Sequence, residues 1–348
     1  MIKGKSGFLG IGAYGGNQVL PFYKADYPSL FANTAHSDLD SLKDVEESHK
    51  FHISGGEGCN KDRKKSKKLI KKNLDAIINE IKEKMPGIEY LFIVGSLGGG
   101  TGAGGIAPMK QIAMYELNLK ACIIVTVLPN TKTESVQALI NAYETLAEIE
   151  SLDELGATFI LDNDKNNNKM KINDMFYCYL DAMLTCNCNS AMGNVDDAEF
   201  EQLLSARGVS IISKLGKDKS DTTNLINTFH NNIYAPLEAD KVIKYVGLVN
   251  TGIGKNINIE DVYTEVGTPL DTYVGYESDY TLCVLSGCSF PYEKMEEIKQ
   301  IIESKKDEVT RNITAQNTKR LSGLNFFDGI EENKQEEKKK KNDRDWLF

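Results

Sequence analysis

The first half of the chain alternates short apolar runs with segments of helical periodicity. Apolar runs of strand length occupy residues 7–11, 90–95, 121–128 and 157–161. Segments with helical spacing of apolar residues begin near residue 17 and occupy residues 64–84, 106–117 and 135–152. This alternation is typical of an α/β domain with a mainly parallel sheet. We therefore predict a first α/β domain over residues 1–172.

A second helical pattern begins near Asn173 and is apolar over an unusually broad face. Its large residues are Met175, Phe176, Tyr179, Leu180, Met183 and Leu184. A helix that is apolar over so wide a face is expected to be sandwiched between two bodies rather than to lie on a surface. We predict a long central helix over residues 173–192.

The remainder of the chain predicts a smaller α/β domain and a polar tail. Strand candidates at residues 242–249 and 280–286 and a helix from residue 292 define the second domain, residues 193–310. Residues 311–348 are expected to be a helix end followed by a flexible charged tail, because so polar a segment cannot bury enough apolar surface to order itself. The chain ends in Trp346, Leu347 and Phe348. These residues are either a short peptide that binds a partner or a flexible terminus.

Composition narrows the class of protein. The 348 residues are 41% hydrophobic and 26% charged, with a formal net charge of −9, which is ordinary for a soluble globular protein. The apolar runs are too short to span a bilayer, and no secretory segment precedes them, so we expect a cytoplasmic protein without membrane contact. The negative charge argues against direct, sequence-specific nucleic-acid binding. A basic run at residues 61–72 is expected to be a solvated helix face, with a docking patch as the alternative.

Three glycine-rich loops follow strand candidates. The first, residues 10–17, contains GxGxxG, which is weak alone because any tight strand-to-helix turn can show it. The second, residues 98–105, lies between an apolar strand and a helix, so its backbone N–H groups and the positive helix end can bind an anion. A flexible linker is the alternative. The third, residues 55–60, precedes the basic run. No GxxxxGK[ST] motif is present, so phosphates would be bound without a P-loop lysine.

The run Gly98–Gly104 resembles the GGGTG[ST]G loop of the tubulin/FtsZ superfamily, and further segments follow in that superfamily's order over residues 1–310. The resemblance implies a Rossmann-like GTPase domain with a central helix, GTP or GDP as ligand, and Mg²⁺ held mainly by phosphates and water rather than by a protein metal site. Glu134 would contact the ribose, and Asn163 and Asn173 would read guanine. The complete set of implied nucleotide contacts is Gly10, Gly12, Ala13, Tyr14, Gly15, Gly16, Asn17, Gln18, Asn33, Thr34, Gly56, Gly58, Asn60, Gly98, Gly99, Gly100, Thr101, Gly102, Ala103, Gly104, Glu134, Asn163 and Asn173.

Residues 193–204 resemble the superfamily loop that inserts into the nucleotide pocket of the next subunit. By that resemblance Asp196 and Glu199 orient or polarise the attacking water, and Asp197 is a spare candidate if the register shifts by one. Residues three apart at a helix start lie on one face, so both carboxylates can approach one water. The same two residues also fit an Asp-x-x-Glu capping box, which would only satisfy helix N–H groups.

The resemblance implies a GTP-dependent filament that assembles head to tail and hydrolyses GTP between subunits. Within the superfamily the chain is most similar to the TubZ proteins of plasmids and phages, which move DNA through a DNA-binding adaptor that engages the filament tail. An FtsZ-like division filament, a phage spindle filament and a non-hydrolysing structural filament remain alternatives. An NAD-dependent oxidoreductase built on residues 10–15 is more distant, because Asp26 is too early and Asp38 lies in a polar loop rather than at a strand end.

Overall fold

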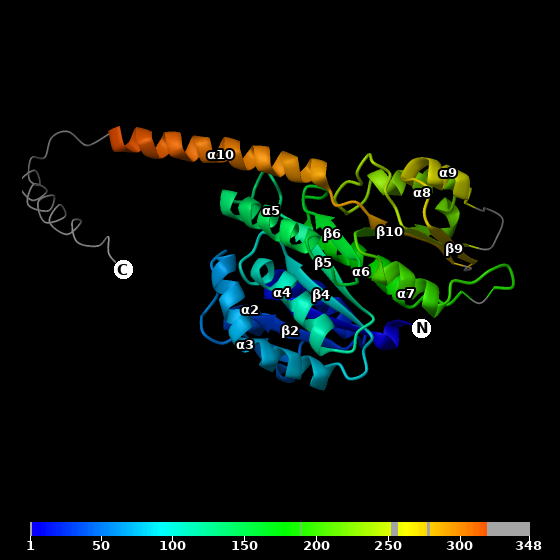
Figure 1. The fold of residues 1–348 in the computed structure, drawn as a ribbon, viewed down its shortest axis with the longest axis horizontal. Coiled ribbons are helices and arrows are strands. Elements are labelled where there is room, and N and C mark those ends of the chain that lie inside the picture. The colour runs from blue at the N-terminus through cyan, green and yellow to red at the C-terminus, as the bar shows by residue number, and fades with distance from the viewer. Residues whose placement is uncertain (1, 189, 252–256, 277–278, 319–348) are drawn as a thin grey trace, which may run out of the picture. The chain divides into compact units, whose positions relative to one another are not determined.

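The computed structural model describes residues 2–188, 190–251, 257–276 and 279–318 (Figure 1). The chain divides after Ile302, and the fold described below is that of the unit ending there. Trp346, Leu347, Phe348 and the rest of the predicted tail from residue 319 onward lie outside the described residues.

Within the described residues, ten strands form one sheet in the order β3-β2-β1-β4-β5-β6-β7-β10-β8-β9. Neighbouring strands from β3 through β7 are parallel, whereas β10 is antiparallel to both β7 and β8. The prediction of an α/β fold with a mainly parallel sheet is therefore confirmed. The strands are β1 (Ser6–Ile11), β2 (Ser29–Asn33), β3 (Lys50–His52), β4 (Tyr90–Ser96), β5 (Ala121–Leu128), β6 (Thr158–Asp162), β7 (Val209–Gly216), β8 (Tyr245–Asn250), β9 (Asp271–Tyr276) and β10 (Tyr280–Cys288).

Helices connect most of these strands. The α-helices are α1 (Gly12–Lys24), α2 (His36–Asp40), α3 (Arg63–Lys84), α4 (Thr101–Glu116), α5 (Val136–Glu150), α6 (Lys169–Leu184), α7 (Asp197–Ser205), α8 (Thr222–His230), α9 (Ile259–Val266) and α10 (Tyr292–Thr318). Short 3₁₀ helices are η1 (Ile2–Lys5), η2 (Glu47–His49) and η3 (Lys217–Lys219). No helix of the described part is long and apolar enough to cross a membrane.

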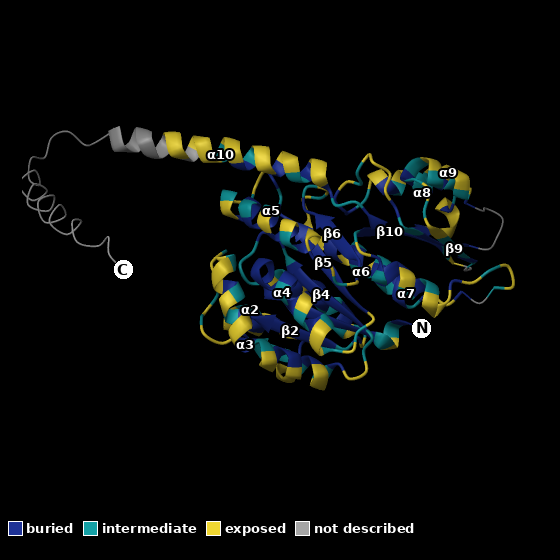
Figure 2. Cartoon of the chain, viewed as in Figure 1, coloured by how far each residue is buried: buried dark blue, intermediate teal, exposed yellow. Residues whose placement is uncertain are grey.

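The parallel strands form the buried centre of the molecule, and exposed residues concentrate on the helices and loops (Figure 2). Every residue of β1 and of β5 is buried, as expected for a parallel sheet covered on both faces. These strands were predictable because their apolar runs are continuous. β2, β3, β7 and β9 were not predicted. β3 is three residues long and β9 alternates half-buried and buried positions, so neither contains such a run.

The central helix α6 is sandwiched, as its broad apolar face predicts. Tyr177 makes an edge contact with Phe22 of α1, at 5.0 Å between ring centroids. Phe176 makes edge contacts with Phe159 of β6 at 5.6 Å and with Tyr234 at 6.4 Å. α6 begins at Lys169, earlier than predicted, because the side chain of Asn168 caps its first turn.

The sheet runs through both predicted domains, although β6 and β7 share a single paired position, Thr158 with Val209. The predicted boundaries at residues 172 and 192 stay predictions. The central helix itself is shorter than predicted at its carboxyl end: α6 ends at Leu184 rather than at residue 192, where the backbone N–H and the hydroxyl of Thr185 both donate to the Asp181 carbonyl oxygen.

Candidate nucleotide-binding site

A cavity of about 350 Å³ lies where β4, β5 and β6 end. Open parallel sheets bind their ligands at the carboxyl ends of the strands, because loops and helix N-termini converge there. Ser96 ends β4, Val127 lies near the end of β5, and Asn163 directly follows β6. The full lining is Tyr14, Asn17, Lys61, Ser96, Gly98, Gly99, Val127, Pro129, Glu134, Ala138, Asn163, Lys169, Met170 and Asn173.

The glycine-rich segment is divided between this cavity and the packing of α4. Gly98 and Gly99 line the cavity, but α4 begins at Thr101 rather than at residue 106 as predicted. A Cβ on Gly104 would lie 2.5 Å from the Arg63 carbonyl oxygen, and one on Gly105 would lie 2.4 Å from Ile70 Cδ1. Both glycines lie in α4. They are glycines because α3 packs too closely against α4 for any side chain. The sequence alone suggested a loop, since glycine is unfavourable inside helices.

The buried side-chain amide of Asn141, which no sequence pattern predicted, holds the second glycine-rich loop in place. Asn141 of α5 is 1% exposed. Its Nδ2 donates to the Gly99 carbonyl oxygen at 2.9 Å and to the Lys61 carbonyl oxygen at 2.8 Å, and its Oδ1 accepts from Gln137. Asn141 therefore links the second glycine-rich loop to Lys61, the residue that directly follows the third. A lone asparagine in an amphipathic helix gives no local signal of such a role.

The predicted Asn33–Thr34 pair divides its contacts between two loops. The buried Thr34 hydroxyl lies 2.8 Å from the hydroxyl of Thr101, the first residue of α4. The Thr34 carbonyl oxygen accepts from the backbone N–H of Gly58 at 2.9 Å, which attaches the third loop. Asn33 instead donates to Asp38 and accepts from the N–H of Ala35, within its own turn.

A carboxylate between two lysines lies at the cavity. Glu134 accepts from Lys169 Nζ at 2.8 Å and lies 3.6 Å from Lys61 Nζ. The hydrogen bond from Lys169, opposed in part by burial, holds the pKa of Glu134 below its usual range. Neither lysine was among the predicted contacts. Lys61 was hidden within the basic run, and Lys169 within a polar segment. Both place positive charge where an anionic ligand would sit.

Asn163 and Asn173 both line the cavity and are each less than a tenth exposed. Their backbones are fixed, because Asn130 Nδ2 donates to the Asn163 carbonyl oxygen and Gln18 Nε2 donates to that of Asn173, each at 3.2 Å. Each side-chain amide offers a donor and an acceptor, as a nucleobase edge requires. Gln18 therefore supports the site from behind rather than lining it.

The structure separates the predicted contacts into three groups, and their role in nucleotide binding stays a prediction. The residues that line the cavity are Tyr14, Asn17, Gly98, Gly99, Glu134, Asn163 and Asn173. The positions that are buried in the packing of α1 and α4 are Gly10, Gly12, Gly15, Gly16, Gln18, Gly102, Ala103 and Gly104. The residues in the surrounding loops and first helical turns are Ala13, Asn33, Thr34, Gly56, Gly58, Asn60, Gly100 and Thr101.

The donor set suits a phosphate ligand better than a caged metal ion. Glu134 is the only carboxylate among the lining residues, which all belong to the described chain, and two lysines surround it. Mg²⁺ needs oxygen ligands and retains water readily. These residues therefore fit a magnesium ion that keeps phosphate and water ligands, as the sequence resemblance implies.

Asp196 and Glu199 form the capping box of α7. Asp196 Oδ1 accepts from the backbone N–H groups of Ala198 and Glu199, and Glu199 Oε2 accepts from that of Asp196 at 2.9 Å. The capping interpretation is therefore correct for the single chain. Asp197 is the first residue of the helix.

These two carboxylates lie far from the cavity of their own chain. Glu201, two residues after Glu199, accepts hydrogen bonds from Tyr90 at 3.1 Å and from Lys120 at 2.7 Å. Tyr90 begins β4, and Lys120 directly precedes β5. α7 is therefore at the amino ends of the strands, whereas the cavity is at their carboxyl ends. The eight residues of β5 span about 26 Å, too far for either carboxylate to act in its own cavity.

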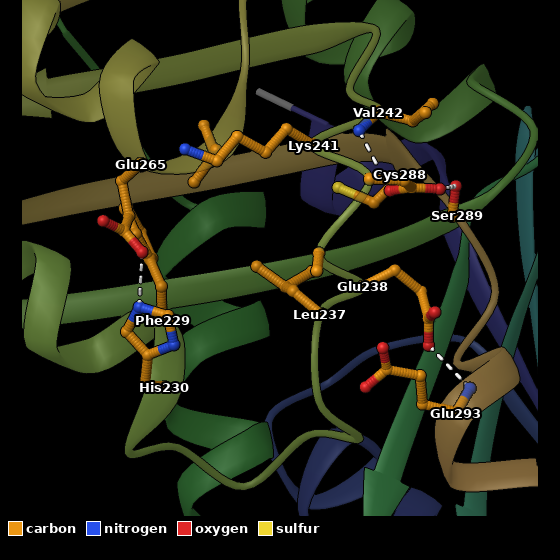
Figure 3. A pocket seen from close by; sticks show the side chains of 13 residues that line it. Phe229, His230, Leu237, Glu238, Lys241, Val242, Glu265, Cys288, Ser289 and Glu293 are labelled. Atoms are coloured by element: carbon orange, nitrogen blue, oxygen red, sulfur yellow. Dashed lines mark hydrogen bonds and ion pairs between the residues drawn. The ribbon is translucent and has the colours of Figure 1, made fainter.

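A second cavity, of about 290 Å³, lies beside α8, α9 and the end of β10 (Figure 3). Its polar groups already pair with one another. His230 pairs with Glu265 at 2.7 Å, and Glu238 accepts from the backbone N–H of Glu293 at 3.0 Å. None of its lining residues belongs to a glycine-rich loop.

Sequence comparisons match the chain to tubulin-like proteins. Residues 17–171 match the model of the Tubulin/FtsZ family, GTPase domain. The chain is 29% identical over 309 residues to the tubulin-like protein TubZ of Clostridium botulinum C phage, covering 87% of this chain and 84% of that relative. It is 24% identical over 269 residues to the tubulin-like protein CetZ of Pyrococcus horikoshii, covering 72% and 68%.

Solved structures give the same fold. The crystal structure of Clostridium botulinum phage c-st TubZ superposes with a TM-score of 0.77 at 28% identity, covering 88% of this chain and 99% of that one. A GTPγS-form protofilament of Bacillus thuringiensis serovar israelensis TubZ gives a TM-score of 0.74 at 16% identity, covering 90% and 94%. On the family match and the similarity to TubZ together, the chain contains a GTPase domain of the Tubulin/FtsZ family and is a GTPase.

Proposed function

We propose that this GTPase forms head-to-tail filaments, hydrolyses GTP where subunits meet, and uses the filament to segregate plasmid or phage DNA. The observation that carries the proposal is the separation of Asp196 and Glu199 from the cavity of their own chain. Two halves of one hydrolytic site at opposite edges of a sheet can meet only between molecules. Such a contact joins two different surfaces and does not close, so it generates an open filament.

The geometry of the capping box suits the catalytic role as well as the structural one. The capping bonds use Oδ1 of Asp196 and Oε2 of Glu199. The second oxygen of each carboxylate therefore remains for a water molecule, while the cap fixes both side chains on one face of the helix start. Positioning and general-base assistance of this kind are typically worth about 10²–10⁴ in rate.

The cavity would contribute binding and orientation. The N–H groups of the loop at Gly98 and Gly99 and the N-terminal end of α4 would hold phosphate oxygens. Lys61 and Lys169 would add positive charge, and Asn173 would contact the base. A bound Mg²⁺ would supply neutralisation of the charge that develops on the phosphates.

The segregation role is supported by the similarity to phage TubZ and would require a DNA-binding adaptor. The charged C-terminal segment, which ends in Trp346, Leu347 and Phe348, is the proposed binding element for that adaptor. The protein would act in the cytoplasm. An FtsZ-like division filament differs in the partner of this segment, which would be a membrane-linked division protein.

The proposal is tested by measuring GTP turnover and light scattering together over a range of protein concentrations. Both should rise above one critical concentration, because each hydrolytic site needs two subunits. Turnover per molecule that stays constant with concentration, without polymer, would show a self-contained site and refute the filament mechanism.

The segregation role needs a separate measurement. Retention of a plasmid carrying the wild-type gene is compared with retention of the same plasmid carrying Glu199→Gln. Faster loss of the variant plasmid is expected because its filaments cannot turn over. Equal retention would contradict DNA segregation while leaving the hydrolytic mechanism intact.

A further inference from the structure

Two of the chain's four histidines meet one glutamate beside β3. His36 begins α2, His52 ends β3, and Glu57 lies in the loop between β3 and α3. One ligand atom from each residue lies within 4.8 Å of the other two. Among the described residues, this is the only group of three or more His, Cys, Asp or Glu side chains that satisfies that condition.

The separations match those around a tetrahedral ion. His36 Nδ1 lies 2.7 Å from Glu57 Oε1, and His52 Nε2 lies 3.6 Å from the same oxygen. Zinc bonds of about 2.0–2.2 Å place neighbouring ligand atoms about 3.3 Å apart in tetrahedral geometry. The observed distances lie on either side of that value. The Glu57 side chain is 68% exposed, so it can move the few tenths of an ångström that are needed.

The two imidazoles lie against each other beside the Glu57 carboxylate. The ring centroids are 3.4 Å apart, with an interplanar angle of 26°. A shared divalent ion would take one lone pair from each ring and one from the carboxylate. Because imidazole lone pairs lie in the ring plane, the His36 ring, which is 58% exposed, would turn out of the stack to reach the ion.

We propose that His36, His52 and Glu57 bind a divalent transition-metal ion of the zinc class. Two imidazole nitrogens and one carboxylate oxygen suit zinc, nickel, copper or cobalt, whereas magnesium and calcium prefer oxygen ligands alone. The Thr34 carbonyl oxygen, 3.2 Å from His52 Nε2, accepts the imidazole proton in the metal-free protein. For Nε2 to bind the ion, the neutral ring must carry its proton on Nδ1 instead. Water or the carbonyl oxygen completes the coordination.

The position of the site gives the ion a structural consequence. It would join the β2–α2 turn to the loop before α3. Both segments already meet at Thr34, which bonds to Gly58 of that loop and to Thr101 of α4. Metal binding would therefore stiffen the third glycine-rich loop next to the nucleotide cavity.

The test uses the full chain, stripped with a chelator and free of nucleotide, so that its outcome is independent of GTP hydrolysis. Zn²⁺ binding is measured by calorimetry, and Co²⁺ is added as a spectroscopic probe. One equivalent of Zn²⁺ should bind, and Co²⁺ should give tetrahedral absorption without a thiolate charge-transfer band. His36→Gln and His52→Gln should each weaken Zn²⁺ binding by more than the roughly 10–100-fold that loss of an outer-shell partner costs.

His230→Gln is the matched control. His230 lies 2.7 Å from Glu265, the same separation as in the His36–Glu57 pair, but it does not belong to the three-residue cluster found in the described chain. Its replacement should leave Zn²⁺ affinity unchanged. In the imidazole NMR spectrum of the wild type, Zn²⁺ should shift the resonances of His36 and His52 and leave those of His49 and His230.

Three results would overturn the proposal. They are an unchanged Zn²⁺ affinity in the folded His36→Gln and His52→Gln variants, an equal loss in His230→Gln, and a thiolate charge-transfer band that places Co²⁺ on cysteine. His36 is 58% exposed, so its replacement leaves the core intact, and thermal unfolding of each metal-free variant verifies this.

Discussion

Lys169 of α6 donates a 2.8 Å hydrogen bond to Glu134, and both residues line the nucleotide cavity. The bond joins the amino end of the central helix to the loop that precedes α5. It thus connects two elements that both line the cavity. A ligand that contacts either residue acts on both.

The first prediction concerns the stability contributed by this ion pair. The lowered pKa of Glu134 means that folding favours its carboxylate form, so its contribution is present above the unfolded value of about 4.3 and is lost as pH falls through the folded pKa. We expect Glu134→Gln to reduce the free energy of unfolding at pH 7 by about 0.5–1 kcal/mol, because the pair is partly exposed.

Urea unfolding at pH 7 and at pH 3.5 measures this difference. The difference in unfolding free energy between wild type and Glu134→Gln should narrow at the lower pH, and it should shrink at pH 7 in a Lys169→Met background, where only Lys61 remains beside the carboxylate. A difference in unfolding free energy of equal size at both pH values would show that the charge of the Glu134 carboxylate does not contribute to stability.

The second prediction concerns Asn141, whose side-chain amide bonds to the Gly99 and Lys61 carbonyl oxygens. Asn141→Ala leaves the Gly99 and Lys61 carbonyl oxygens without their donor, which costs about 1–3 kcal/mol when such groups stay buried. We expect lower stability and weaker binding of a fluorescent GDP analogue. Gln137→Ala is the control, since it removes the Gln137–Asn141 bond and leaves the contacts of Asn141 to the loops. Equal GDP affinity in the two variants would contradict the role of Asn141.

The third prediction separates packing from ligand binding in the glycine-rich segment. Gly→Ala inside a helix normally stabilises by about 0.5–1 kcal/mol. At Gly104 the new Cβ would meet the Arg63 carbonyl oxygen at 2.5 Å and Ser66 Cβ at 2.6 Å, so Gly104→Ala should instead destabilise by about 1–3 kcal/mol. Nucleotide-free chemical unfolding measures this change. Gly4→Ala is the control, because no atom lies within 4 Å of its added Cβ, and a neutral Gly104→Ala would refute tight α3–α4 packing.

The fourth prediction distinguishes capping from catalysis at α7. Glutamine can accept the Asp196 N–H bond as glutamate does, so Glu199→Gln should retain wild-type stability and polymer formation. Its GTP turnover in the polymer should fall by about 10²–10⁴-fold, because the carboxylate is gone. Glu199→Ala should lose turnover and also some stability, through loss of the cap. Wild-type turnover in Glu199→Gln would assign Glu199 to capping alone.

The sequence by itself determined the elements whose signal is local. β5 spans residues 121–128 as predicted, because a continuous apolar run bounded by polar residues can bury itself only as an interior strand. The glycine-rich run from Gly98 pointed to the end of the sheet at which the cavity lies, since backbone that must approach a ligand excludes side chains locally. The resemblance to the tubulin/FtsZ superfamily showed that these segments follow one another in that superfamily's order, and it implied the nucleotide contacts.

The tertiary structure decided what depends on partners distant in the chain. Asn141 reaches residues 42 and 80 positions away, and Lys169 reaches Glu134 35 positions away, so no periodicity marks them. The glycines after Thr101 became helical because α3 packs against them, which overrides their local preference for a loop. The capping box was readable from Asp196 and Glu199, but their placement at the opposite edge of the sheet from the cavity followed only when the whole sheet was assembled.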